Sequence, residues 1–190
     1  MQKKAFLLIF VTALVFIFTS CSKLKNAVID KHPDMSSPFS CSFSISLDED
    51  TEVSGTMSKL GTGIWSMDIT APETLSGLNI SYSTEGVKAS LGELELQIPK
   101  EKINAGAAFE LVFSAIDSYA ADAAPTLTET EEGLRYIGEL SQIGFTMTFD
   151  KETLQLTNID FGENGISARI SNISPLGAEP QNTPEAATSE

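Results

Sequence analysis

The fold follows from residues 39–47, which read FSCSFSISL and alternate apolar residues with serines without interruption. Successive side chains of a β-strand point to opposite faces, so this alternation places one face against an apolar core and the other in water. We therefore predict a strand here. Cys41 lies on its apolar face and is predicted to be a small buried residue, not a reactive thiol.

The same period of two recurs on both sides of this strand. The further runs lie at 65–69, 78–82, 87–91, 94–98, 134–140, 143–149, 154–161 and 166–170. Turn residues separate them, as at Gly61-Thr62-Gly63 and Asn164-Gly165. Changes of phase near residues 157–158 and 172–173 predict bulges or strand ends. The whole pattern predicts an antiparallel meander.

Between residues 103 and 121 the period changes to that of an amphipathic helix. Its apolar stripe holds Phe109, Val112, Phe113, Ile116 and Ala120. Its other side holds Glu110, Ser114, Asp117 and Ser118, while Leu111 falls outside the stripe and is expected to be exposed. A stripe this aromatic is suited to pack on a sheet, so we interpret it as core, with contact to a ligand as the alternative.

The predicted order is roughly six strands, one helix and four strands, in one antiparallel sheet that is too long to stay flat. We therefore predict a mainly β domain at 38–174. It is a curled antiparallel sheet that forms an incomplete, half-open β-barrel, with the amphipathic helix packed on its concave face.

The N-terminus has the order of an export signal. Lys3 and Lys4 precede an uncharged apolar run at 5–18, followed by Thr19, Ser20 and Cys21. The run is too short for a comfortable membrane span, which needs about 20 apolar residues. An uncleaved anchor helix and an ordinary signal peptide cut near Ser20 are the alternatives, and both also predict export.

Residues 18–21 (FTSC) resemble the lipobox of bacterial lipoproteins. The resemblance implies a signal peptide at 1–20, removed after the Cys21 thiol has received diacylglycerol, and further acylation such as palmitate. A protein held by two or three acyl chains stays on the extracytoplasmic side of the cell membrane. Residues 21–37 are then the lipidated cysteine and a flexible tether, and the Pro-, Ala-, Thr- and Glu-rich residues 175–190 are a disordered tail.

Charge and composition limit the partners. The formal net charge is −14, and removal of Lys3 and Lys4 with the signal peptide makes it −16. An acidic surface repels nucleic acid and anionic headgroups, so the membrane partner is reached through the lipid on Cys21 and no nucleic-acid partner is expected. With Cys21 lipidated, Cys41 has no partner and no disulfide is predicted.

The residue inventory argues against an enzyme. The single histidine, His32, lies in the tether, and there is no Gly-x-Ser-x-Gly elbow, Cys-x-x-Cys pair or phosphate-binding loop. The acidic runs at 48–50 and 129–132 offer carboxylate pairs for glycosidase-type chemistry, but solvated loop charge is the usual explanation. We predict no catalytic residues, no metal and no cofactor.

A resemblance to a known family rests on residues 65–78 (WSMDITAPETLSGL) and the strand pattern Leu78-Asn79-Ile80-Ser81-Tyr82. A strand with an aromatic residue runs into a Pro-x-x-Leu-x-Gly turn and then into an apolar-Tyr strand, and this block looks like the LolA/LolB/LppX-type lipoprotein carriers. The resemblance implies an unclosed β-barrel whose hydrophobic cavity holds acyl chains of lipids or of other lipoproteins.

Two functional hypotheses follow. In the first, the concave face binds a lipid or lipoprotein acyl chain through Phe43, Trp65, Met67, Ile69, Tyr82, Phe113 and Phe145. These residues fit a plain core equally well by type. In the second, the domain is an anchored protein-interaction or envelope-sensing module with a filled core, whose protein partner the sequence does not identify.

Overall fold

The computed structural model describes residues 32–47, 51–99, 102 and 108–177. The predicted signal peptide, Cys21, the acidic run at 48–50, the first residues of the predicted helix and the chain after residue 177 lie outside the described residues.

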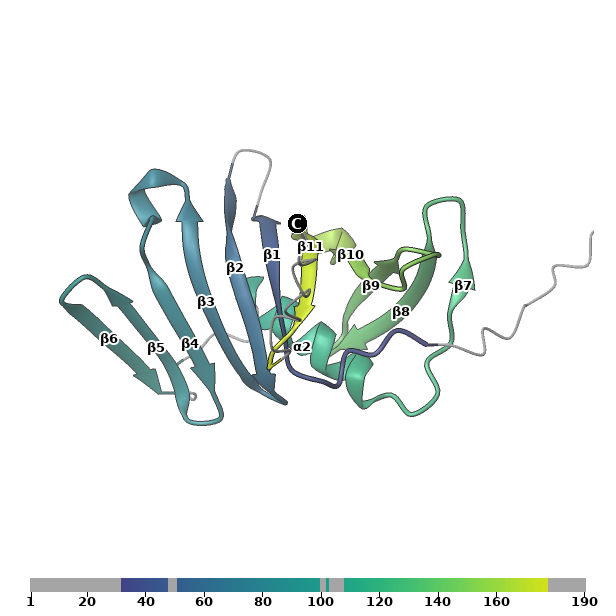
Figure 1. Ribbon diagram of the computed structural model, residues 1–190, viewed down its shortest axis with the longest axis horizontal. Helices are drawn as coiled ribbons and strands as arrows, with labels where there is room; N and C mark the ends of the chain where they lie inside the picture. The colour runs from purple at the N-terminus through teal and green to yellow at the C-terminus, as the bar shows by residue number, and fades with distance from the viewer. Residues whose placement is uncertain (1–31, 48–50, 100–101, 103–107, 178–190) are drawn as a thin grey trace, which may run out of the picture. The chain divides into compact units, whose positions relative to one another are not determined.

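Eleven antiparallel strands form one sheet (Figure 1). The first six are β1 (Phe39–Ser46), β2 (Glu52–Gly61), β3 (Ile64–Ala71), β4 (Asn79–Ser83), β5 (Gly86–Leu91) and β6 (Leu94–Pro99). After helix α2 (Ala108–Ala121) come β7 (Thr128–Glu129), β8 (Leu134–Leu140), β9 (Ile143–Phe149), β10 (Leu156–Asp160) and β11 (Ser167–Pro175). Two short 3-10 helices, η1 (Glu73–Leu75) and η3 (Gly162–Asn164), lie in connections.

The sheet is not closed into a barrel. Its strand order is β6-β5-β4-β3-β2-β1-β11-β10-β9-β8-β7, so β6 and β7 are its two ends. The chain starts in the middle at β1, reaches one end at β6, passes through α2 and returns from the other end to β11 beside β1. The predicted mainly β fold with an unclosed antiparallel sheet and one helix is confirmed. Five strands follow the helix where four were predicted, because the two-residue β7 is too short to show a period.

The strand registers confirm the predicted bulges. The pairing of β10 with β9 shifts between Leu156 and Asn158. The pairing of β1 with β11 shifts between Ser40 and Ser42, opposite Asn172, whose φ is +53°. Cys41 is buried as predicted, and this burial raises the pKa of its thiol to about 12.

The buried side of α2 is wider than predicted. Val112, Ala115 and Ile116 are fully buried, as an apolar stripe requires. The expectation that Leu111 is exposed was wrong, because only 3% of Leu111 is accessible. The helix packs against both halves of the sheet, with Phe113 on Trp65 of β3 and Tyr119 on Tyr136 of β8, so more than one narrow stripe faces protein. Within the described ranges no helix combines the length and apolar character needed to cross a membrane.

The last residues of the predicted tether lie against α2. Pro33 and Met35 are buried, and the Tyr119 hydroxyl donates a hydrogen bond of 3.3 Å to the carbonyl oxygen of Pro33. The carboxylate of Asp34 accepts hydrogen bonds from Ser36 and Ser37, which lower its pKa. We call residues 32–37 the N-terminal strap.

A test of the packing uses two glycines in the β8–β9 hairpin. A Cβ atom on Gly138 would lie 2.3 Å from the buried Phe145 ring, whereas one on Gly144 would meet no atom within 4 Å. Gly138→Ala should lower the free energy of unfolding by about 2 kcal/mol, because the ring must move within a packed core. Gly144→Ala should change it by no more than about 0.5 kcal/mol. Urea unfolding of both variants measures this, and equal effects would contradict the packing described.

Candidate functional site

The site is the sheet face that carries α2, which corresponds to the predicted concave face. Trp65, Met67 and Ile69 of β3 are buried on this face. Directly paired residues of neighbouring strands share a face. The pairs Trp65–Tyr82 and Met67–Ile80 therefore place Tyr82 and Ile80 of β4 on the same face.

The same face continues to the end of the sheet through strictly apolar pairs. Beyond Tyr82 lie Val87 and Ile98, beyond Ile80 lie Ala89 and Leu96, and Leu91 pairs with Leu94. We call these residues of β4, β5 and β6 the β4–β6 apolar face. The opposite face of the same strands is polar and carries Ser81, Ser83, Lys88, Ser90, Glu95 and Gln97.

No element in the described part of the chain covers the outer part of the β4–β6 apolar face. The accessible fractions of Leu94, Leu96 and Leu91 are 75%, 58% and 41%. The helix has 14 residues and spans about 21 Å, whereas eleven strands at about 4.8 Å spacing span about 48 Å. Figure 1 shows β4, β5 and β6 extending away from α2. One helix of this length leaves part of the sheet without a layer on it.

Beneath α2, by contrast, the face is filled with aromatic side chains. The Phe113 ring stacks on Trp65 with centroids 4.7 Å apart and an angle of 11° between the planes. Phe39 also meets Trp65 edge-on, with centroids 5.9 Å apart, and Phe43 meets Phe109 at 6.4 Å. These contacts make this part of the face a packed core.

The seven predicted ligand residues all lie in this region but not in one group. Phe43, Trp65, Met67, Ile69, Phe113 and Phe145 are each at most 3% accessible, and Tyr82 is half-buried. The structure brings Trp65, Tyr82 and Phe113 together. Phe145 lies apart with Tyr136 and Phe161. The exposed leucines of β5 and β6, which sequence reasoning missed, extend the same face.

Tyr82 marks the boundary between the filled and the uncovered parts. Its hydroxyl donates a hydrogen bond of 2.9 Å to Oε1 of Glu110 in the first turn of α2. Burial, and then the neighbouring Glu110 carboxylate, raise the pKa of Tyr82 to about 12. Tyr82 therefore remains protonated at neutral pH and keeps its hydrogen bond to the helix.

A buried ion pair fixes α2 on the sheet. Lys59 of β2 has an accessible fraction of 0%, and its Nζ lies 2.7 Å from Oδ1 of Asp117 in α2. The same Nζ donates a hydrogen bond of 2.9 Å to the Met35 carbonyl in the N-terminal strap. Oδ2 of Asp117 accepts hydrogen bonds from the Gly63 amide at 2.9 Å and from Trp65 Nε1 at 3.0 Å. This Lys59–Asp117 cluster joins four segments of the chain.

Sequence reasoning missed this cluster and placed Asp117 on the solvent side of the helix. A signal was present, because Lys59 continues the inward phase of Val53, Gly55 and Met57 along β2. A lysine at an inward position must find a counter-charge, since an unpaired buried ammonium is costly. The partner lies 58 positions away along the chain, so the spacing alone did not identify it.

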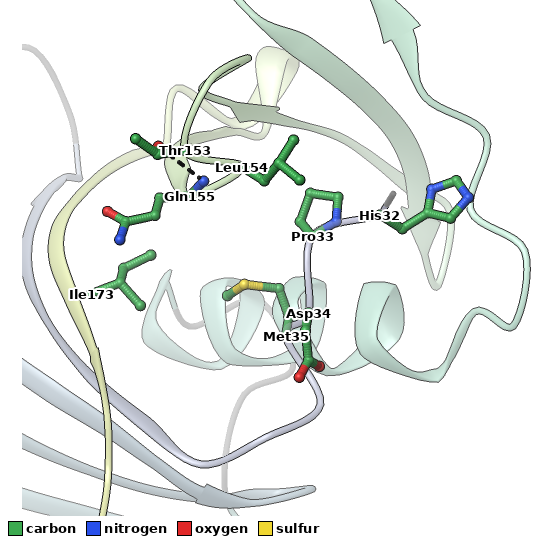
Figure 2. Close-up of a pocket in the computed structure, with 8 residues that line it drawn as sticks. All are labelled: His32, Pro33, Asp34, Met35, Thr153, Leu154, Gln155 and Ile173. Atoms are coloured by element: carbon green, nitrogen blue, oxygen red, sulfur yellow. Dashed lines mark hydrogen bonds between the residues drawn. The ribbon is translucent and has the colours of Figure 1, made fainter. Parts of the chain in front are cut away.

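A cavity of about 260 Å³ lies between the N-terminal strap and the connection from β9 to β10 (Figure 2). Residues 32–35 line one side, and residues 153–155 together with Ile173 line the other. None of the seven predicted ligand residues borders it. His32, which is exposed, is one of the residues that line this cavity.

No metal-binding group of three or more His, Cys, Asp or Glu side chains occurs in the described part of the chain. The acidic run at 129–132 is largely exposed, and its Glu129 and Glu132 pair with Lys151 and Arg135. This arrangement fits the expected solvated charge.

The Lys59–Asp117 cluster gives a stability prediction. Lys59→Met should lower the free energy of unfolding by about 3 kcal/mol, because it leaves the Asp117 carboxylate largely buried without its cation. The control is Lys88→Met, which removes an exposed pair with Glu95 and should cost less than about 1 kcal/mol. Urea unfolding of both variants measures the difference. A Lys59→Met variant as stable as the control would show that the cluster does not fix the helix.

Comparisons with known proteins gave matches among solved structures alone: no protein-family model and no curated protein matched the chain. An uncharacterized conserved protein from Thermus thermophilus has a TM-score of 0.46 and 11% identity, over 77% of this chain and 88% of that chain. A LolA superfamily protein from Nitrosomonas europaea has a TM-score of 0.39 and 11% identity, over 80% and 91%.

A third match comes from the Clostridioides difficile complex of the CwlD amidase with the GerS lipoprotein. Its TM-score is 0.42 and its identity 8%, over 75% of this chain and 85% of that chain. At these identities the likeness concerns the fold.

Proposed function

We propose that this chain is a lipid-anchored protein on the extracytoplasmic side of the bacterial cell membrane that binds a lipid or an acyl chain on the β4–β6 apolar face. The observation that carries the proposal is the exposure of Leu94 and Leu96 on the same face as the buried Trp65 and Met67. This face is a continuation of the core that no described element covers.

The chemistry of the face selects an apolar ligand. Apolar surface left in water costs about 25 cal/mol per Å², and an alkyl chain laid on the leucines would remove that cost. The face holds one polar group, the Tyr82 hydroxyl, and this group already donates to Glu110. A phosphate would therefore find no free hydrogen-bond donor there, whereas an acyl chain needs none.

The proposal assigns places to the residues predicted from the sequence. Tyr82 contacts the ligand at the inner end of the face, next to Trp65 and Phe113. Met67 and Ile69 of β3 are buried on the same sheet face and pack beneath this inner end. Phe43 packs against Phe109 of α2, where a longer chain would reach it only if the helix moved, and Phe145 is buried apart from the ligand with Tyr136 and Phe161.

The anchor follows from the lipobox resemblance at 18–21. Ten residues separate the lipidated Cys21 from the start of the strap at His32, and the eleven Cα–Cα steps between them reach at most about 40 Å. The domain would therefore work close to the membrane that supplies its ligand.

The second candidate is an anchored protein-interaction or envelope-sensing module. It is favoured by the filled interior, because six of the seven predicted ligand residues are buried against their neighbours. In that case the exposed leucines would contact a protein instead of a lipid.

The ligand can be tested in cells that produce the full chain and are fed a photoactivatable fatty acid with an alkyne tag. Light-dependent labelling should map to peptides of β4–β6. Leu94→Glu with Leu96→Glu should reduce it about tenfold or more, because each leucine contributes about 1.5 kcal/mol or more to apolar binding. The control, Ser81→Glu with Ser83→Glu, adds the same charge to the opposite face and should retain labelling. Equal labelling of both variants at equal stability would refute the lipid ligand and favour the protein-interaction module.

The same experiment tests the anchor. Fatty acid attached through Cys21 labels the chain without light, and Cys21→Ser should abolish this light-independent label. A label that survives the substitution would contradict the lipobox assignment while leaving the ligand result standing.

A further inference from the structure

The outer edge of β6 is the long free edge of the sheet. Among the described residues β6 pairs with β5 alone, over six residues, and forms one end of the strand order. The other end, β7, has two residues and offers little backbone for pairing. A long edge strand presents unpaired N–H and C=O groups, and natural proteins usually blunt such edges. Of the two ends of the sheet, the β6 edge is therefore the more accessible for pairing with a further strand.

The register of the β5–β6 hairpin determines which backbone groups point outward. Gly92 and Glu93 form a two-residue turn, and Leu91 pairs with Leu94 across it. In such a turn the amide of Leu94 bonds to the carbonyl of Leu91. Antiparallel ladders alternate, so Leu96 and Ile98 also bond to β5, and the amides of Glu95 and Gln97 point outward. Pro99, which has no amide hydrogen, falls on the outward phase as well, where none is needed.

We propose that β6 pairs in antiparallel fashion with β6 of a second copy of this chain, with the two-fold axis at Leu96. In this register Glu95 of each copy lies opposite Gln97 of the second copy, and each such pair exchanges two backbone hydrogen bonds. The outward amides and carbonyls of both residues are then satisfied in both copies.

The charges of the strand fit this register. A two-fold axis at Leu96 places the neutral Gln97 side chain, and not a second carboxylate, opposite each Glu95. The Glu95 carboxylate is already balanced by Lys88, whose Nζ lies 2.9 Å from its Oε2. Like charges directly opposite each other destabilise strand pairs, and this register avoids them.

The apolar side chains of β6 also fit this register. Leu96 lies opposite Leu96 of the second copy, and Leu94 lies opposite Ile98, so the two most exposed leucines among the described residues gain apolar neighbours. The β4–β6 apolar faces of the two copies join into one surface. This pairing needs no ligand and therefore goes beyond the proposed function.

Cysteine cross-linking of the full chain in cells tests the register. Cα atoms of a non-hydrogen-bonded antiparallel pair lie about 4.5 Å apart, a distance that a disulfide spans. Leu96→Cys should therefore give a covalent dimer on mild oxidation that disappears on reduction. Glu95→Cys, whose counterpart lies opposite residue 97, should give no more dimer than the parent chain. Absence of the Leu96→Cys dimer, or an equal yield from Glu95→Cys, overturns the proposal.

A second pair of variants tests the backbone contact without added cysteines. Gln97→Pro removes the outward amide and should leave the chain monomeric when its mass is measured by light scattering. Gln97→Ala keeps the amide and should remain dimeric. Both variants retain the β5–β6 bonds, so their urea unfolding should match at protein concentrations low enough for both to be monomeric. A dimer that survives Gln97→Pro would show that the β6 edge is not the interface.

Discussion

The buried ion pair between Lys59 and Asp117 is the interaction on which the rest of the structure depends. A buried charge is tolerated only where its partner and hydrogen bonds are complete. Here completion requires the strap carbonyl of Met35, the turn amide of Gly63 and the indole of Trp65 to lie in fixed positions around the helix. A helix without this pair could slide along an apolar sheet, because apolar contact alone has little directional preference.

The fixed position of the helix divides the sheet into two parts of different character. Under α2, apolar residues meet one another and form a core. Beyond Tyr82, residues with the same alternation have no layer above them, and Leu94 is mostly accessible. The proposed ligand face and the proposed strand pairing both arise from this division, since both use the end of the sheet that the helix does not reach.

Alternation along the chain was enough to predict most of the strands, their turns and the bulges near Asn158 and Asn172. It identifies which residues share a face but not what lies on that face, which is why the exposed leucines of β6 were missed. Leu111 was predicted to be exposed because a helical wheel assumes one supporting surface, and α2 has two. Lys59 was overlooked because its partner is distant in the chain, and β7 because two residues have no period.

The chain contains a single tryptophan, and its surroundings make it a natural spectroscopic reporter. Trp65 is buried, stacks on Phe113 of the helix and donates its indole hydrogen to Asp117. Its fluorescence therefore responds to the distance between helix and sheet, and not to events at the far edge of β6. The emission spectrum of the unlabelled protein distinguishes a ligand that rests on the outer strands from one that lifts the helix and enters beneath it.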